Sequence, residues 1–231
     1  MYSEVLPGLL LSTLCPFIPF ILGLFRIRRM DPAYFPFVVV LGCATLAESV
    51  RFIQLSNYYA EWGMGIGLTP IPYNIYVLAI GLSYTLLFFN WGLYRGNKKL
   101  LTITLVLLAL VWGVDHFLVP GHSIHGFTRW YRLLYSTLIC LFSIHHINKL
   151  IVTERNTLLK NSSFLICVGI LLFFMVYIVN EGILLFDLKT TRQFLESINM
   201  VRKGLNFVVY LVIFTLAVLW IPPKKPFIQL S

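Results

Sequence analysis

Three carboxylic acids interrupt long apolar stretches of the sequence, and these are the residues from which chemistry is first expected. Glu48, Asp115 and Glu181 each lie within a run rich in Leu, Ile, Val and Phe. A charge inside a bilayer is costly unless it is paired or faces water. Counting about 1.5 Å per helical residue from the basic end of each run places each acid roughly 20 to 25 Å along its helix. The three acids therefore share a depth, and we expect them to act together.

Other runs bring polar and basic residues to the same depth. The residues that complete this candidate ligand cavity are Arg51, Asn74, His116, Arg129, Arg132, Asn180 and Arg202. If their side chains point inward, they line an outward-opening cavity in which the acids pair with arginines. Such a network, roughly neutral in total, would bind a small polar or zwitterionic ligand from the outer side. The alternative is interfacial, because long side chains near the end of a span can reach the membrane surface.

Catalytic chemistry has less support in the sequence. Three acids at one depth could perform acid–base hydrolysis on a lipid head group. However, the sequence contains no serine elbow, no paired Cys and His, and no glycine-rich phosphate loop. We therefore assign no catalytic residue and expect no cofactor.

The histidines argue against a metal centre. Three lie near the outer end of the fourth run and two near the opposite end of the fifth, namely His116, His122, His125, His145 and His146. A helix joining the two groups is about 25 Å long, so they cannot share one ion. A mononuclear site that uses Asp115 and the three outer histidines stays an alternative. Our prediction is that the protein holds no metal.

The composition indicates where these residues must be positioned. The chain has 231 residues, of which 58% are hydrophobic and 12% charged, and its mean hydropathy is +0.83. An ordinary globular domain is about 25% charged. We therefore expect a protein that lives in a lipid bilayer as a single transmembrane domain over 1–231, without an attached kinase, nucleotide-binding or DNA-binding module.

Seven apolar runs have the length that a membrane-spanning helix requires. They cover approximately 7–25, 34–52, 73–94, 100–119, 130–147, 164–186 and 205–221. Strands of a membrane barrel would be about half as long, so the fold class predicted is all-α, a polytopic bundle of seven transmembrane helices. The small residues expected at helix contacts are Gly81, Gly113, Gly169 and Gly182. The outer segment from Gln54 to Pro72 is rich in Gly and Pro, which predicts an ordered loop or a lid.

The basic residues predict the orientation. Eleven of the 18 fall on one side of the predicted membrane: Arg26, Arg28, Arg29, Arg95, Lys98, Lys99, Lys149, Arg155, Lys160, Lys224 and Lys225. The richer side is cytoplasmic by the positive-inside rule, so the N-terminus lies outside and the C-terminus inside. The excess of basic charge is read as a topology signal and as contact with anionic lipid, and no nucleic-acid partner is expected.

Several local patterns together resemble a group of small seven-span inner-membrane proteins common in Bacteroidota. They are Glu48 in the second run, Tyr73 to Tyr76 at the start of the third, Ile147 to Leu150 after the fifth, Asn180 and Glu181 in the sixth, and the ending Trp220 to Lys225. That group is similar to the seven-span sensing regions joined to bacterial histidine kinases. The resemblance implies a multi-pass protein of the bacterial inner, or cytoplasmic, membrane. It implies no activity.

The cytoplasmic two-thirds of the predicted bundle is almost wholly apolar, which favours one class of function. A polar cavity at the outer end of a bundle whose cytoplasmic part is closed by apolar side chains is typical of a receptor or sensor, whereas a channel needs polar residues along its length. With no output domain, such a sensor must act through a separate cytoplasmic or membrane protein. We expect that contact on the inner loops and around His145, His146, Lys149 and Arg155. A small-solute transporter and an intramembrane lipid-modifying enzyme that uses the outer carboxylates are the alternatives.

Overall fold

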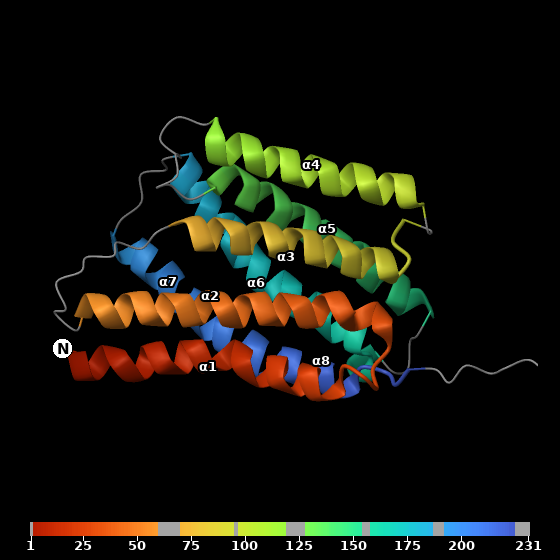
Figure 1. Cartoon of the computed structure of the whole chain (residues 1–231), viewed down its shortest axis with the longest axis horizontal. Coiled ribbons are helices and arrows are strands. Elements are labelled where there is room, and N and C mark those ends of the chain that lie inside the picture. Colours follow the sequence, from red (N-terminus) through yellow and green to blue (C-terminus); the bar gives the residue numbers. More distant parts are fainter. Residues whose placement is uncertain are drawn as a thin grey trace, which may run out of the picture.

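Helices make up nearly all of the described chain. The computed structural model describes residues 2–59, 70–94, 97–118, 128–153, 158–186 and 192–224, and within these ranges no β-strand forms. Figure 1 shows the long helices lying side by side along one axis. In chain order the elements are α1 (Tyr2–Arg26), the 3-10 helix η1 (Pro32–Tyr34), α2 (Phe35–Tyr59), α3 (Pro70–Asn90), α4 (Lys98–Phe117), α5 (Arg129–Thr153), the 3-10 helix η2 (Leu158–Lys160), α6 (Ser162–Leu185), α7 (Arg192–Phe207), the π-helix η3 (Val208–Phe214) and α8 (Thr215–Trp220).

The lengths and apolar surfaces of these helices fit a bilayer. Six of the described helical stretches are long and apolar enough to cross a membrane: Pro32–Ile53, Pro72–Asn90, Lys98–Phe117, Arg129–Thr153, Ser162–Leu185 and Met200–Trp220. Each has at least 19 residues, which at about 1.5 Å per residue approaches the roughly 30 Å of a hydrocarbon core. The protein is therefore a helical, multi-pass membrane protein.

A helix lies over each of the seven ranges that the sequence predicts, with differences at the ends. The expected loop from Gln54 to Pro72 is too long at both ends, because α2 continues to Tyr59 and α3 begins at Pro70. The rest of that segment, 60–69, lies outside the described residues, and so does the lid that was expected there. Helix α5 continues beyond Ile147, where the predicted fifth run ends, to Thr153. The next long helix, α6, is capped by Asn161, whose Oδ1 accepts from the Ser163 and Phe164 amides at 2.9 and 3.2 Å.

Six helical segments form a closed ring, and α4 lies outside it. Around the ring α1 contacts α2, α2 contacts α3, α3 contacts α5, α5 contacts α6, and α6 contacts α7 and η3, which return to α1. Helix α4 packs against α3 and α5 at the edge of the bundle (Figure 1). Only 17% of its apolar stretch is buried inside the protein, against 50% of Pro72–Asn90. What the ring encloses is therefore shaped by α1, α2, α3, α5, α6 and the α7–η3 segment.

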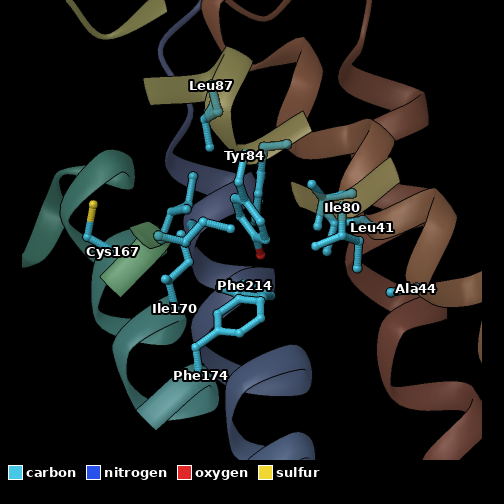
Figure 2. Close-up of a cluster of buried hydrophobic side chains, with 14 of the residues drawn as sticks. Leu41, Ala44, Ile80, Tyr84, Leu87, Cys167, Ile170, Phe174 and Phe214 are labelled. Carbon is cyan, nitrogen blue, oxygen red and sulfur yellow. The ribbon is translucent and has the colours of Figure 1, made fainter. Parts of the chain in front are cut away.

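One half of the ring interior is filled by apolar side chains. Figure 2 shows Leu41, Ile80, Tyr84, Phe174 and Phe214 converging there from α2, α3, α6 and η3. All five are buried, with Leu41 completely inaccessible. This cluster closes the interior of the bundle below Glu48, Arg132 and Glu181.

Two of the four expected glycine contacts hold the helices close together. A Cβ on Gly169 would lie 2.4 Å from Cε1 of Phe214, and one on Gly81 would lie 2.5 Å from the Tyr131 hydroxyl. Only a residue without a side chain allows these approaches of α6 to η3 and of α3 to α5. The expectation for Gly113 and Gly182 is wrong within the described chain, where a Cβ at either position would meet nothing within 4 Å.

The end of α1 meets the C-terminal end of the described chain beside this apolar half. The Arg26 guanidinium, at the end of α1, donates to the carbonyls of Val218 and Ile221 at 3.0 Å each, and to that of Leu219. Cationic side chains stabilise the free carbonyls at the end of a helix, here α8. The Lys224 amide also donates to the Arg29 carbonyl at 2.7 Å. The last helix of the ring is thereby fastened to the first.

Candidate functional site

A cavity of about 380 Å³ opens at the end of the ring where α3 and α5 begin and where α2 and α6 end. Its walls come from all six ring segments and include no described residue of α4. The lining residues are Pro16, Ala44, Ala47, Glu48, Val50, Arg51, Pro72, Tyr73, Tyr76, Arg129, Arg132, Phe173, Tyr177, Asn180, Glu181, Leu184, Arg202, Asn206 and Tyr210. The wall thus combines charged, aromatic and aliphatic side chains.

Seven of the ten residues that the sequence singles out line this cavity. They are Glu48, Arg51, Arg129, Arg132, Asn180, Glu181 and Arg202. Four ring segments, α2, α5, α6 and α7, supply them. The other three, Asn74, Asp115 and His116, lie together in a different place that is described below.

The most buried charged pair in the wall joins α5 to α6. Nη2 of Arg132 lies 2.9 Å from Oε2 of Glu181, and the two side chains are 8% and 2% exposed. The expected pairing of Glu181 with an arginine is therefore confirmed. Removing one partner of such a pair leaves the other as an uncompensated buried charge, which makes the pair far more sensitive to substitution than a surface contact.

A second, more open pair lies on α2. Nη1 of Arg51 is 3.5 Å from Oε2 of Glu48, with side-chain exposures of 43% and 21%. The i, i+3 spacing brings the two groups to one helix face, as the sequence suggests. Arg202 of α7 interacts electrostatically with both Glu48 and Glu181 across the cavity. The charged groups of three helices therefore share one electrostatic environment.

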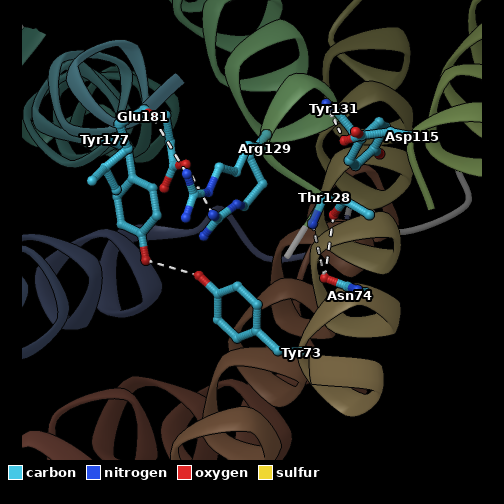
Figure 3. A network of polar contacts seen from close by, with 10 residues as sticks. Tyr73, Asn74, Asp115, Thr128, Arg129, Tyr131, Tyr177 and Glu181 are labelled. Carbon is cyan, nitrogen blue, oxygen red and sulfur yellow. Dashed lines mark hydrogen bonds and ion pairs between the residues drawn. The ribbon is translucent and has the colours of Figure 1, made fainter. Parts of the chain in front are cut away.

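Tyrosines form another part of the wall, and of these Tyr76, Tyr177 and Tyr210 were not predicted. The Tyr73 and Tyr177 hydroxyl oxygens are 3.1 Å apart, and Figure 3 shows them pointing toward one another from α3 and α6. Arg132 lies over the Tyr73 ring at 5.5 Å and Arg202 over the Tyr177 ring at 5.9 Å, so each ring faces a cation. Tyr76 and Tyr210 were missed. The signal that could have found this wall is a stripe at helical spacing on α6: Phe173, Tyr177, Asn180, Glu181 and Leu184.

The last ring segment changes its helical winding at the cavity. Asn206 is the last residue but one of α7, which ends at Phe207, and Tyr210 lies within the π-helix η3. The Thr215 hydroxyl donates to the Tyr210 carbonyl at 3.2 Å. π-helical turns in α-helices occur frequently at functional sites. Oδ1 of Asn206 is buried and has no hydrogen-bond partner among the described residues. This segment therefore offers the cavity a buried acceptor.

The charge of the cavity differs from expectation. Its described lining holds four arginines and two glutamates, a net charge of +2. A roughly neutral network with Asp115 as its third acid was expected, from the shared depth of the groups and the zero net charge of the predicted outer side. Helix α4 lies outside the ring, so Asp115 does not line the cavity, and the expectation of neutrality is wrong for this part of the chain.

Asn74, Asp115 and His116 belong to a second polar group, which we call the anchor cluster: Asn74, Trp112, Asp115, His116, Thr128 and Tyr131. Nδ2 of Asn74 lies 3.3 Å from Nδ1 of His116, and the Trp112 indole donates to the Asn74 carbonyl at 3.0 Å. The Thr128 amide and hydroxyl each donate to Oδ1 of Asn74 at 3.3 Å. These bonds hold α3, α4 and the start of α5 together.

Asp115 serves the first turn of α5. Its Oδ2 accepts from the Tyr131 amide at 2.9 Å, and the side chain is nearly fully buried. A carboxylate at a helix N-terminus satisfies a free N–H group and interacts favourably with the helix dipole. Figure 3 shows Asp115, Asn74 and Thr128 gathered around this helix start, to one side of Tyr73, Tyr177 and Glu181. Because Arg129 and Arg132 lie in the first turns of α5, the anchor cluster also positions the cavity's arginines.

No metal site is found in the part of the chain that the structure describes. None of its His, Cys, Asp and Glu side chains gather in groups of three or more that could hold an ion. His116 instead stacks on Trp112, with ring centroids 5.0 Å apart. The alternative site would also need His122 and His125, which lie outside the described residues.

Comparison with protein-family models, with curated proteins and with solved structures gives no match for this chain. The interpretation of the cavity therefore depends on its own residues and their geometry.

Proposed function

We propose that this protein is a receptor-like membrane protein that binds a small ligand in the cavity and acts through a separate partner. The observation that carries the proposal is a charged, aromatic cavity of about 380 Å³ at one end of the bundle, above an interior closed by packed apolar side chains (Figure 2). Charged side chains within membrane-spanning segments cost free energy, and they are found there mainly where they serve a function.

The proposal includes seven spans with the N-terminus outside, so that the cavity opens away from the cytoplasm. In this arrangement α1 is the first span, and the end opposite the cavity faces the cytoplasm of a bacterial inner membrane. Its support is the concentration of described basic residues at that end: Arg26, Arg28, Arg29, Lys98, Lys99, Lys149, Lys160 and Lys224. Positive charge is enriched on the cytoplasmic side of membrane proteins. A reporter enzyme fused after Ser231 should be active only in the cytoplasm, and activity in the periplasm would refute this orientation.

A transporter is the second candidate, but the apolar half of the ring favours a receptor. A transport path needs groups that could replace the solvation of a solute on both sides of the cavity. The hydroxyls of Thr85 and Ser143, which lie deeper in the bundle, donate to carbonyls of their own helices at 2.8 and 2.9 Å. Those hydroxyls already donate within their own helices, so their protons do not offer hydrogen bonds to a passing solute. An enzyme would need a carboxylate free for proton transfer, whereas Glu181 is held by Arg132, Asp115 by the start of α5, and Glu48 pairs with Arg51 at 3.5 Å.

The partner would bind at the cytoplasmic end in this proposal. The α5 extension to Thr153 continues beyond the predicted end of the span. The last turns of α5 present His145, two residues before that end, and Lys149, two residues beyond it, and both side chains are exposed, whereas Arg155 lies outside the described residues. His146, by contrast, is buried, stacked on Trp91 and 3.2 Å from the Ser163 hydroxyl. We therefore place the contact on the exposed residues of this extension.

The experiment that tests ligand binding is native mass spectrometry of the protein released from membranes with its endogenous lipid. Ala47 lines the cavity, so Ala47→Trp should fill it and remove the co-purifying molecule. Leu46→Trp is the matched control, because Leu46 is the adjacent residue of α2 and is 68% exposed. Loss of the bound mass from Ala47→Trp alone supports the proposal. Equal masses on both variants and on the original protein, or no bound molecule on any of them, would refute it.

A further inference from the structure

We infer that the ligand of this cavity is an amphiphilic anion, with an acidic group held between Arg129 and Arg202 and an apolar body on the aromatic wall. The inference rests on the proposed function and specifies its ligand. Its first support is the distribution of charge around the cavity.

The two glutamates of the wall are each committed to a different arginine. Glu181 pairs with Arg132 at 2.9 Å and Glu48 with Arg51 at 3.5 Å. Among the described lining residues this leaves the charges of Arg129 and Arg202 in excess. Both side chains are half-buried, in a setting where hydrogen bonds to an ionised group are stronger than neutral ones. An anion would bring the lining toward neutrality, and a cation would increase its charge imbalance.

Arg129 and Arg202 reach the cavity lining from α5 and α7, two ring segments that both contact α6, the helix that carries Glu181. Arg129 is on the first turn of α5 and its Nη1 donates weakly to the Leu184 carbonyl at 3.4 Å. Arg202 is on α7 and lies over the Tyr177 ring at 5.9 Å. Both interact electrostatically with the Glu181 carboxylate. An anionic group between them would therefore bind next to the Arg132–Glu181 pair without breaking it.

The remainder of the wall selects the body of the ligand. Apolar and aromatic groups line much of the cavity, including Pro16, Phe173, Tyr76 and Leu184. Sites of this kind bind a ligand largely by apolar contact and use a few polar groups to orient it. The buried Oδ1 of Asn206, unpartnered among the described residues, would accept from a hydroxyl on the ligand. A hydroxylated anion with an apolar body fits the two arginines, the aromatic wall and the Asn206 acceptor.

This chemistry has two sources, a soluble organic acid or an anionic phospholipid, and the experiment has an arm for each. The full chain is placed in nanodiscs of phosphatidylcholine. In the first arm the Kd of 4-hydroxybenzoate is compared with that of its neutral isostere, 4-hydroxybenzamide. In the second arm the melting temperature is compared between discs with and without phosphatidylglycerol, whose head group is an anion with hydroxyls.

The variants are Arg129→Gln and Arg202→Gln, with Lys203→Gln as the control. Lys203 is the next residue of α7, has the same charge and is exposed away from the cavity lining. Each arginine variant should raise the Kd of the anion at least about tenfold, since a hydrogen bond to a charged group contributes that much or more. Lys203→Gln should leave the Kd unchanged. In the second arm, the same arginine variants should abolish the stabilisation by phosphatidylglycerol.

The outcomes separate this inference from the proposed function. Preferential binding of 4-hydroxybenzoate assigns a soluble acid, and stabilisation by phosphatidylglycerol alone assigns a lipid; both require the arginines. If 4-hydroxybenzamide binds as tightly as the acid, the cavity binds ligands but the inferred anion selectivity is wrong. If neither anion binds in a way that depends on Arg129 or Arg202, the inference is also overturned. The co-purification test with Ala47→Trp then decides the proposed function independently.

Discussion

The cavity wall and the anchor cluster lie at the same end of the bundle and are built from similar residue types, but their polar groups have different partners. In the anchor cluster, Asp115 and Asn74 accept from backbone amides of α5 and its preceding residue. In the cavity wall, Glu181 and Glu48 contact arginine side chains beside open space. The anchor cluster fixes where a helix begins. The charged side chains of the cavity wall instead face the open space of the cavity.

The difference depends on whether a helix belongs to the ring. Glu181 is on α6, a ring helix whose inner face borders the cavity. Asp115 is on α4, which packs outside against α3 and α5, so its inward side chain meets the start of α5 instead. An acid at a given depth of a membrane helix can therefore serve either binding or assembly, and substitutions should separate these roles.

The largest effect is expected for Glu181→Gln. The change removes the carboxylate that compensates Arg132 in a site where both side chains are less than a tenth exposed. We expect the free energy of unfolding in detergent to fall by about 3 to 5 kcal/mol. Arg132→Met combined with Glu181→Leu should recover most of that loss, because an apolar pair of similar volume needs no compensation. Thermal and denaturant unfolding of the original protein, of each single variant and of the double variant measures both the loss and the recovery. A loss below about 1 kcal/mol would show that the pair is effectively exposed to water.

A smaller effect is expected for Asp115→Ala in the anchor cluster. The substitution leaves the Tyr131 amide without its carboxylate acceptor, and the loss of a charged hydrogen bond at a helix start costs about 1.5 to 3 kcal/mol. Stability should fall more than the affinity for anions, since the carboxylate does not line the cavity and acts on Arg129 only through the first turn of α5. Hydrogen exchange of the first turn of α5 should rise in parallel. A changed anion selectivity at unchanged stability would contradict the separation of the two regions.

Gly169→Ala tests the closed interior below the cavity. The added Cβ would lie 2.4 Å from the Phe214 ring, and overpacking of this kind costs about 1 to 3 kcal/mol. Gly182→Ala on the same helix is the control, because its Cβ would meet nothing within 4 Å. The control should be neutral or slightly stabilising, since Ala favours helix over Gly. Equal melting temperatures for the two variants would argue against the close packing of α6 on η3.

The smallest effect is expected for Glu48→Gln. Its ion pair with Arg51 is 3.5 Å long and partly exposed, and pairs of this kind contribute less than about 1 kcal/mol. Unfolding should therefore be nearly unchanged in the detergent assay that detects Glu181→Gln. A loss as large as that of Glu181→Gln would mean that both glutamates are equally buried parts of one network.

The sequence predicts the helices well because their signal is local. Runs of about 20 apolar residues identify the regions of the long helices, and charge at a shared depth identifies most of the charged lining. The errors come from packing. Periodicity does not reveal that α4 lies outside the ring, so Asp115 and His116 were assigned to the cavity. Gly113 and Gly182 resemble Gly81 and Gly169 in sequence, and only the neighbouring helix distinguishes them. Tyr76, Tyr177 and Tyr210 were missed because aromatic residues are common in apolar runs.

The most direct test of the account is the accessibility of the cavity from the two sides of the membrane. Asn206→Cys places a thiol in the cavity lining, and Leu41→Cys places one in the buried apolar half. Each is exposed to a membrane-impermeant maleimide in intact cells and in inside-out vesicles, with the parent chain as the blank. We predict labelling of Asn206→Cys in intact cells only, and none of Leu41→Cys. Labelling of Asn206→Cys from the cytoplasmic side, or from both sides, would contradict an outward-opening cavity above a closed interior.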